Sequence, residues 1–216
     1  KVVCRLSSTK EIALTRTPLN YSSAVLFGGL NYEMATTKVR KIISSDRTFR
    51  NGQNGYEELP YTLNEVNNVN SLLKKLRIRT NLFIGEKGTE KQFRELDGKS
   101  VSLIHIATHG DYVTLKETEA DDAMKCCFLI MSGANATEEN NDGLLQADEI
   151  SALNLRGCRM VVLSACNTGQ GTLGADGIFG LQRGFKNAGV QTILMTLANV
   201  DDQASMLLMT RFYKNL

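Results

Sequence analysis

Two short motifs contain the residue types that a cysteine-dependent reaction needs. The first is 107-ATHGD-111, which includes His109, and the second is 164-SACNTGQG-171, which includes Cys166. A cysteine nucleophile requires thiolate character, a base within hydrogen-bond reach and donors for the developing oxyanion. An imidazole has an unperturbed pKa close to neutrality and can act as that base. We therefore interpret Cys166 as a nucleophile and His109 as its proton-transfer partner.

Backbone amides next to these side chains can supply the oxyanion donors. The amides of Gly110 and Cys166 are our candidates, and glycine at position 110 lets a substrate carbonyl approach the backbone closely. The run 169-GQGTLGADG-177 holds four glycines before an expected helix and can curve around a peptide. His105 lies in the middle of the apolar stretch that leads to His109. A mid-strand histidine is more often structural, so we assign His105 to the core.

Other chemistries fit these motifs less well. The run 169-GQGTLG-174 matches G-x-G-x-x-G, but no acidic residue stands near position 190 to bind a ribose, and no Walker lysine follows. A serine hydrolase would need a G-x-S-x-G elbow, which does not occur. A lone cysteine at a strand end can also be a small buried apolar residue. The five cysteines include no C-x-x-C pair, which argues against a disulfide framework and against a zinc site. We expect no metal and no cofactor.

The composition is that of an ordinary globular protein. Hydrophobic residues make up 42% and charged residues 22% of the chain, and the net charge is +2. No basic run of five or six residues points to nucleic acid as a partner. No run of eighteen apolar residues points to a membrane span. Unpaired cysteines fit a reducing compartment, so we expect a cytoplasmic location.

Apolar runs alternate with helical patterns along the chain. Strands are expected at residues 24–30, 82–84, 101–108, 160–165 and 191–197. Helices are expected after Pro60, at residues 89–96 and 177–188, and from Asp201 or Asp202 onward. Thr62 with Glu65, and Thr89 with Gln92, match capping boxes at the first two helices. The alternation predicts an α/β fold with a parallel sheet, and the continuous apolar strands predict helices on both faces.

The chemistry lies where two of these strands end. In a parallel α/β sheet, ligands bind beyond the carboxyl ends of the strands. The strand at 101–108 ends just before His109, and the strand at 160–165 ends just before Cys166. If the two strands are neighbours, both residues meet at one sheet edge, on the loops that follow. The polar segment 111–141 breaks the regular pattern, and we expect a small β-hairpin or a mobile loop there.

With these motifs in place, the sequence resembles the CHAT domain family, a branch of the caspase-like cysteine peptidases related to separase and gingipain. The resemblance implies a three-layer sandwich with a mostly parallel central sheet flanked by helices. It implies a domain at residues 24–216, preceded by an extension or linker at 1–23, with the last strand of the fold missing from this chain. The matching pieces are 104-IHIATHGD-111, 142-DGLLQADEISALNLRGCRMVVLSACNTGQG-171 and 174-GADGIFGLQRGFKNAGVQTILMTLANVDDQASMLLMTRFYKNL-216.

The resemblance also implies a reaction, namely peptide-bond hydrolysis by a Cys–His dyad. The histidine of the family's T-H-G motif falls on His109, and the cysteine of its S-A-C motif falls on Cys166. The expected partners are a protein or peptide substrate and a regulatory repeat domain or partner protein, with no nucleic acid and no membrane. Two other functions stay open. One is a catalytically idle module of the same fold that only binds partners, and the other is an α/β nucleotide binder without peptidase activity.

Relatives in this peptidase group read the residue before the cut, P1, with a charged residue in a pocket beside the nucleophile. The candidates here are Asp176, Asp201 and Asp202, all acidic, which would favour arginine or lysine at P1. The same three residues stand where helix N-caps are expected, and capping would occupy their oxygens. The family's S-L-W motif corresponds to 196-TLAN-199, and the chain has no tryptophan. An apolar pocket for leucine or methionine is therefore the alternative.

Overall fold

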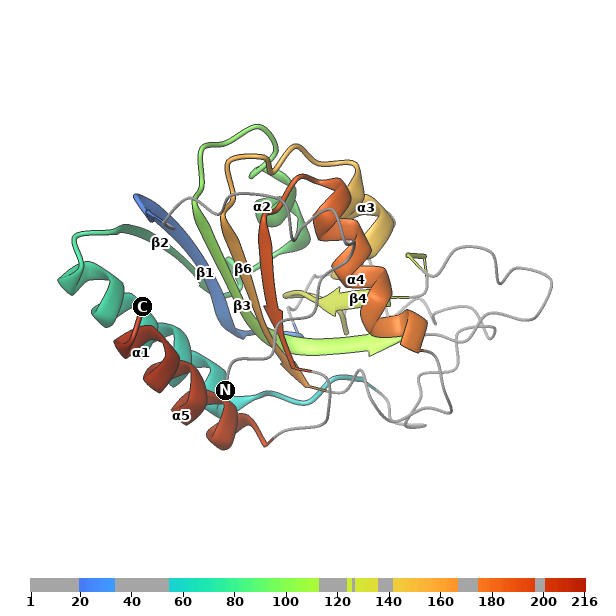
Figure 1. Cartoon of the computed structure of the whole chain (residues 1–216). Coiled ribbons are helices and arrows are strands. Elements are labelled where there is room, and N and C mark those ends of the chain that lie inside the picture. Colours follow the sequence, from blue (N-terminus) through green and yellow to red (C-terminus); the bar gives the residue numbers. More distant parts are fainter. Residues whose placement is uncertain are drawn as a thin grey trace.

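A computed structural model describes residues 20–33, 55–112, 124–125, 127–135, 142–166, 175–196 and 201–216. The side chains of Tyr112, Cys166 and residues 175–179 lie outside the described part. The described strands form one sheet whose parallel portion has the order β2-β1-β3-β6-β7 (Figure 1). These strands are β1 (Ser23–Leu30), β2 (Arg79–Gly85), β3 (Leu103–Tyr112), β6 (Met160–Cys166) and β7 (Thr192–Met195). The predicted α/β class with a mostly parallel sheet is confirmed.

The far end of β3 carries an antiparallel extension. β4 (Cys127–Ile130) pairs with it so that Gly110 lies opposite Leu129, and β5 (Leu144–Gln146) pairs with β4 in turn. We expected a small β-hairpin or a mobile loop within residues 111–141. The structure sets one strand of an antiparallel pair, β4, in that segment and its partner, β5, just beyond it. Residues 113–123, 126 and 136–141 of the segment lie outside the described residues.

Helices cover both faces of the sheet and make a three-layer sandwich of the caspase-like kind (Figure 1). On one face lie α1 (Pro60–Lys75) and α5 (Asp202–Lys214), and on the other lie α2 (Glu90–Arg94), α3 (Ala147–Ser151) and α4 (Ala175–Asn187). The first face buries a core that includes Leu26, Val66, Leu73, Val162 and Met209. The second buries a core that includes Phe27, Phe93, Ile106, Leu181 and Phe185.

The start of α1 differs from the capping box expected at Thr62 and Glu65. The helix begins at Pro60, whose fixed φ suits a first helical position, and Leu59 gives no side-chain cap. Thr62 lies inside the first turn, where its hydroxyl donates to the Leu59 carbonyl and accepts from the Gly29 amide. The expected capping box is therefore wrong, because the Thr62 hydroxyl contacts Leu59 and Gly29 and the Glu65 carboxylate faces His105 in the core.

The start of α2 follows the expectation in part. The Thr89 hydroxyl accepts a hydrogen bond from the Gln92 amide at 3.3 Å, so Thr89 is the N-cap. The Gln92 side chain, however, donates to Glu95 instead of reaching back to the cap. Only half of the second capping box forms.

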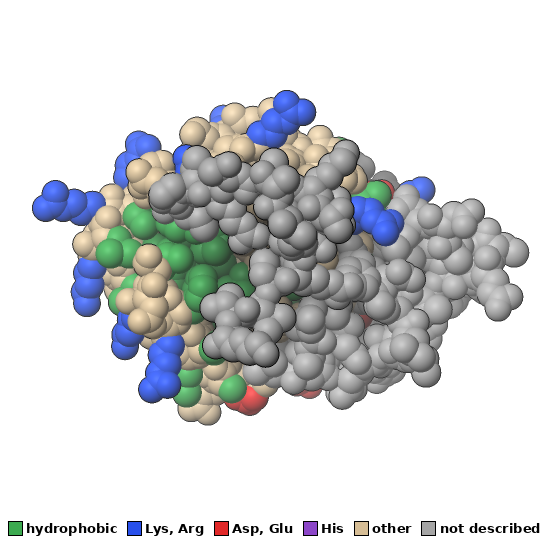
Figure 2. Space-filling view, in the orientation of Figure 1, with side chains coloured by type: hydrophobic (Ala, Val, Ile, Leu, Met, Phe, Trp, Pro, Cys, Tyr) green, Lys and Arg blue, Asp and Glu red, His purple; other side chains and the backbone are tan. Residues whose placement is uncertain are grey.

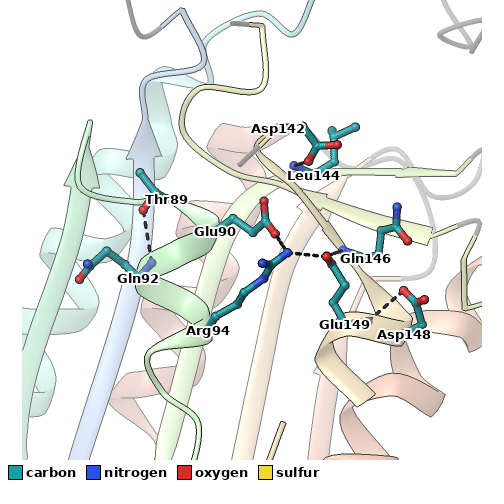
Figure 3. A network of polar contacts seen from close by, with 9 residues as sticks. All are labelled: Thr89, Glu90, Gln92, Arg94, Asp142, Leu144, Gln146, Asp148 and Glu149. Carbon is teal, nitrogen blue, oxygen red and sulfur yellow. Dashed lines mark hydrogen bonds and ion pairs between the residues drawn. The ribbon is translucent and has the colours of Figure 1, made fainter. Parts of the chain in front are cut away.

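A polar network joins α2 to α3 (Figure 3). The Arg94 guanidinium contacts the carboxylates of Glu90 on its own helix and of Glu149 on α3. Glu90 is buried, with 2% of its surface exposed. Burial, with added repulsion from Glu149 and Asp142, outweighs Arg94 and raises the pKa of Glu90 to about 7. The contact between these two short helices therefore depends on a carboxyl group that titrates near neutral pH.

The side of the molecule where α1 and α5 lie carries exposed apolar side chains. Figure 2 shows hydrophobic side chains gathered there, with Lys and Arg side chains around them. Leu63 on α1 and Leu207 and Leu208 on α5 are among the exposed apolar residues. Over the described residues, none of the helices combines the length and the hydrophobicity that crossing a bilayer would take.

Candidate active site

His109 and Cys166 occupy opposite positions on two neighbouring parallel strands. The register between β3 and β6 runs from Leu103 opposite Met160 to His109 opposite Cys166. The prediction that these two strands are adjacent is confirmed. Both residues still belong to their strands, which corrects the expectation that they lie on the following loops. β3 continues past His109 because β4 gives its far end a pairing partner, and Cys166 is the last residue of β6.

One ring nitrogen of His109 is fixed by the backbone. Its Nε2 lies 2.7 Å from the carbonyl oxygen of Glu57, in the segment that precedes α1. A carbonyl oxygen can only accept a hydrogen bond, so Nε2 carries the hydrogen in the neutral ring. The other nitrogen, Nδ1, then presents a lone pair. This is the tautomer in which Nδ1 can take a proton from another group.

Two tyrosines pack beside the His109 ring and against each other, with 6.3 Å between their own ring centroids. The ring centroids of Tyr32 and Tyr56 lie 5.3 Å and 5.6 Å from that of His109. The Tyr56 hydroxyl donates to Asp111 at 2.8 Å, and the Tyr32 hydroxyl shares a 2.9 Å hydrogen bond with Thr108. Both tyrosines are therefore anchored to β3 itself, through the residues just before and just after the histidine in sequence. We did not predict Tyr32, Tyr56 or the Glu57 carbonyl from the sequence.

The surroundings of His109 keep its imidazole neutral. Burial lowers the pKa of His109 below its ordinary value. The Glu57 carbonyl and the negative charges of Asp111, Glu57 and Asp202 oppose this effect without overcoming it. At neutral pH the ring is therefore mostly unprotonated, which is the form that can act as a base.

The backbone beside Cys166 is held from the next strand. The Thr196 hydroxyl, just after β7, donates to the carbonyl of Ala165 at 2.8 Å. Two of the other cysteines lie in the core. Cys127 and Cys158 are buried, and burial raises the pKa of Cys158 to about 12. A thiol with such a pKa has almost no thiolate at neutral pH and is a poor nucleophile.

The remaining candidates occupy three kinds of position. Asp201 is the N-cap of α5, and its Oδ1 accepts from the Ala204 amide at 3.0 Å, as a capping role predicts. Asp202 accepts weakly from the Tyr61 amide, 3.3 Å away, and its charge acts on His109. Asp176 is the second residue of α4, and its side chain lies outside the described residues.

Gly110 is buried in β3 directly after His109. It lies opposite Leu129 of β4, and Cys166 ends β6 on the other side of the histidine. The two proposed oxyanion donors are thus on adjacent strands. Among the described residues, no group of three or more His, Cys, Asp or Glu side chains is arranged to hold a metal ion.

Comparison with known proteins identifies the family. The sequence model of the CHAT domain matches residues 7–216, which is most of the chain. This family is related to the caspase-like peptidases. A search of curated proteins gives no match to the chain.

Proposed function

This chain belongs to the CHAT domain family, and we propose that it is a cysteine endopeptidase with His109 and Cys166 as its dyad. The observation that carries the proposal is the register of β3 and β6, which sets His109 opposite Cys166. The hydrogen bond from His109 Nε2 to the Glu57 carbonyl supports it, because the basic nitrogen is then Nδ1. A neutral, oriented imidazole opposite a cysteine is what thiol activation requires.

The proposed reaction begins when His109 Nδ1 takes the proton of the Cys166 thiol. The sulfur attacks the scissile carbonyl carbon, and the carbonyl π electrons move to oxygen, where the amides of Gly110 and Cys166 stabilise the negative charge. The C–N bond breaks as the histidine returns its proton to the leaving amine, which leaves a thioester. Water then attacks the thioester with His109 again acting as base, and the acid product and free thiol are released.

For the substrate, we propose a preference for a basic P1 residue, with Asp202 as its recognition residue. We choose Asp202 over Asp201 because the charge of Asp202 acts on His109, whereas Asp201 caps a helix. A carboxylate near the proposed dyad would bind arginine or lysine by charge-assisted hydrogen bonds. Asp202 is half-buried, which strengthens such a contact relative to a fully hydrated one.

A cleavage profile on a peptide library tests the activity, with Cys166→Ala as the blank. We expect wild-type protein to cleave and Cys166→Ala to give no turnover. Iodoacetamide labelling should modify Cys166 faster than Cys127 or Cys158. A folded wild-type protein that cleaves nothing and whose Cys166 reacts no faster than the buried thiols would contradict the proposal and favour an idle binding module.

The P1 preference has its own test. Fluorogenic peptides with Arg, Lys, Leu, Met or Asp at P1 should show the highest kcat/KM for Arg and Lys. Asp202→Asn should reduce that preference, whereas Asp201→Asn, which alters only a helix cap, should not. A preference for Leu or Met that survives Asp202→Asn would refute the basic pocket and leave the endopeptidase proposal intact.

A further inference from the structure

The side chain of Asn135 holds the segment that contacts His109. Its Oδ1 accepts from the Tyr56 amide at 2.8 Å, and its Nδ2 donates to the Tyr56 carbonyl at 3.0 Å. One carboxamide thus pairs with both backbone groups of a single residue, as a neighbouring β-strand would. The second hydrogen of Nδ2 goes to the Glu33 carboxylate at 2.7 Å.

These partners fix which way the amide points. A flipped side chain would set its NH₂ group against the Tyr56 amide and its oxygen against the Tyr56 carbonyl and the Glu33 carboxylate, and every contact would then join like groups. In the orientation found, both hydrogens of Nδ2 and the oxygen are used. No other natural side chain of this length offers a donor pair and an acceptor in that arrangement.

Asn135 itself stands on a well-anchored turn after β4. Its own amide donates to the Tyr32 carbonyl at 2.9 Å. Two residues earlier, the Gly133 amide donates to the Asn31 carbonyl, and the Ser132 amide donates to the Gly88 carbonyl. The turn is therefore tied to the residues that follow β1 and to the start of α2. From this support, the Asn135 side chain reaches across to the segment before α1.

The contacts of that segment lead directly to the histidine. The Tyr56 ring packs beside the His109 ring, and its hydroxyl donates to Asp111. The next residue, Glu57, supplies the carbonyl that accepts from His109 Nε2. A shift of Tyr56 would therefore move the ring that packs beside His109 and the Glu57 carbonyl together.

We infer that Asn135 is a positioning residue, which sets the tautomer and orientation of His109 through the backbone of Tyr56 and Glu57. The inference rests on the proposed function for its catalytic consequence, but not for its structural one. Without the Asn135 amide, the Glu57 carbonyl is held less firmly, and the Nε2–H hydrogen bond that selects one tautomer weakens. Nδ1 is then the basic nitrogen for only part of the time.

Histidine NMR tests the structural step without any substrate. The chain has two histidines, so His105 is an internal reference. Wild-type protein should show His109 as a single Nε2–H tautomer in long-range ¹H–¹⁵N spectra above its pKa. In Asn135→Ala the His109 nitrogens should shift toward tautomer-averaged positions, while those of His105 stay unchanged.

The catalytic step is tested by rates. Relative to wild type, Asn135→Ala should lower kcat about 10- to 100-fold with a smaller change in KM, since a displaced base weakens the transition state more than substrate binding. The rate of Cys166 alkylation should fall in parallel. Asn70→Ala is the matched control. It removes the hydrogen bond that the Thr80 hydroxyl on β2 donates to the Asn70 side chain on α1. It should change none of these readouts.

Asn135→Asp gives a second variant of the same size, should the alanine variant fail to fold. It keeps the acceptor for the Tyr56 amide but sets a carboxylate against the Tyr56 carbonyl and Glu33, so it should shift the same readouts in the same direction. Unchanged His109 resonances and unchanged alkylation in a folded Asn135 variant would overturn the inference. If wild type cleaves no peptide but the tautomer still shifts, the positioning stands and only the peptidase proposal fails.

Discussion

β3 carries two histidines four residues apart, and the tertiary structure gives them opposite surroundings. His105 is fully buried, and its Nδ1 shares a 3.2 Å hydrogen bond with the Tyr213 hydroxyl. Its Nε2 lies 2.9 Å from a carboxylate oxygen of Glu65, although the ring N–H is not aligned on that oxygen. Both ring nitrogens of His105 therefore face a partner. At His109, by contrast, Nε2 bonds the Glu57 carbonyl, and no described residue hydrogen-bonds Nδ1.

The difference comes from position along one strand. Residue 105 lies where α1 and α5 cover the sheet, and its partners Glu65 and Tyr213 come from those two helices. Residue 109 lies at the carboxyl end of the parallel β3–β6 ladder, and His109 opposite Cys166 is the last pair of that ladder. An imidazole whose two nitrogens both face partners inside the protein serves the core. An imidazole with one nitrogen oriented and the other available can transfer protons.

The largest expected effect is on turnover. His109→Ala should reduce kcat/KM by about 10²- to 10⁴-fold, the usual contribution of a positioned general base. His105→Ala, measured at a temperature where it is folded, should retain activity within about tenfold of wild type. Steady-state cleavage by both variants checks this. If folded His105→Ala is inactive while His109→Ala is active, the roles of the two histidines are reversed.

When stability is measured, His105→Ala should show the larger loss and His109→Ala the smaller one. His105→Ala leaves the buried Glu65 carboxyl without its partner and creates a cavity, so unfolding free energy should fall by about 3–5 kcal/mol. His109→Ala changes a half-buried ring at a strand end and should cost about 1–2 kcal/mol. Urea unfolding of both variants measures the difference. Equal losses would show that burial of the two rings does not separate their roles.

A smaller effect concerns the protonation of His109. Because burial lowers its pKa, the ring should titrate below the ordinary value of 6.5, and the basic form should persist to lower pH. The His109 imidazole binds a proton more readily in the unfolded state than in the folded state. Lowering the pH from about 6.5 should therefore reduce the free energy of unfolding through the protonation of His109. Asp202→Asn should lower the midpoint further, because a charge that favours imidazolium is removed.

NMR titration of the two histidines measures that midpoint. Asp201→Asn is the control, since Asp201 is not among the groups that act on His109. A His109 midpoint at or above 6.5 would contradict the effect assigned to burial. A midpoint that moves equally in both aspartate variants would contradict the effect assigned to Asp202.

The smallest expected effect concerns Glu90, a buried ionisable group outside the proposed dyad. Folding raises the pKa of Glu90 from 4.5 to about 7, so the folded state binds the extra proton between these values. The stability that protonated Glu90 contributes is therefore present at low pH and is lost as pH rises through about 7. The difference in unfolding free energy between Glu90→Gln and wild type should shift in favour of the variant from pH 5 to pH 8.

Thermal unfolding at pH 5 and pH 8 checks this, with activity expected to stay near wild type at both. Glu95→Gln, on the exposed end of the same helix, provides the control. A stability difference between Glu90→Gln and wild type that is the same at both pH values would rule out titration of Glu90 in this range.

The sequence by itself predicted the architecture and the two strand ends that carry the candidate site residues. Apolar runs separated by helical periods are local signals, and they led to a parallel sheet with helices on both faces. The motifs that contain His109 and Cys166 follow two such runs, so we expected them to meet if the two strands were neighbours. The structure supplies that adjacency and the register that sets the residues opposite each other. The mid-strand position of His105 likewise pointed to the core.

Tertiary structure alone decided which groups surround the two histidines. Glu65 matched a capping pattern in sequence, but Pro60 begins the helix, and the carboxyl faces His105 in the core instead. β3 extends past His109 only because β4 pairs with it, a contact that no local pattern specifies. Glu57 acts through a backbone carbonyl, which every residue type has, from 52 positions away in the chain. Such a role leaves no mark in residue type or spacing, so only the folded chain reveals it.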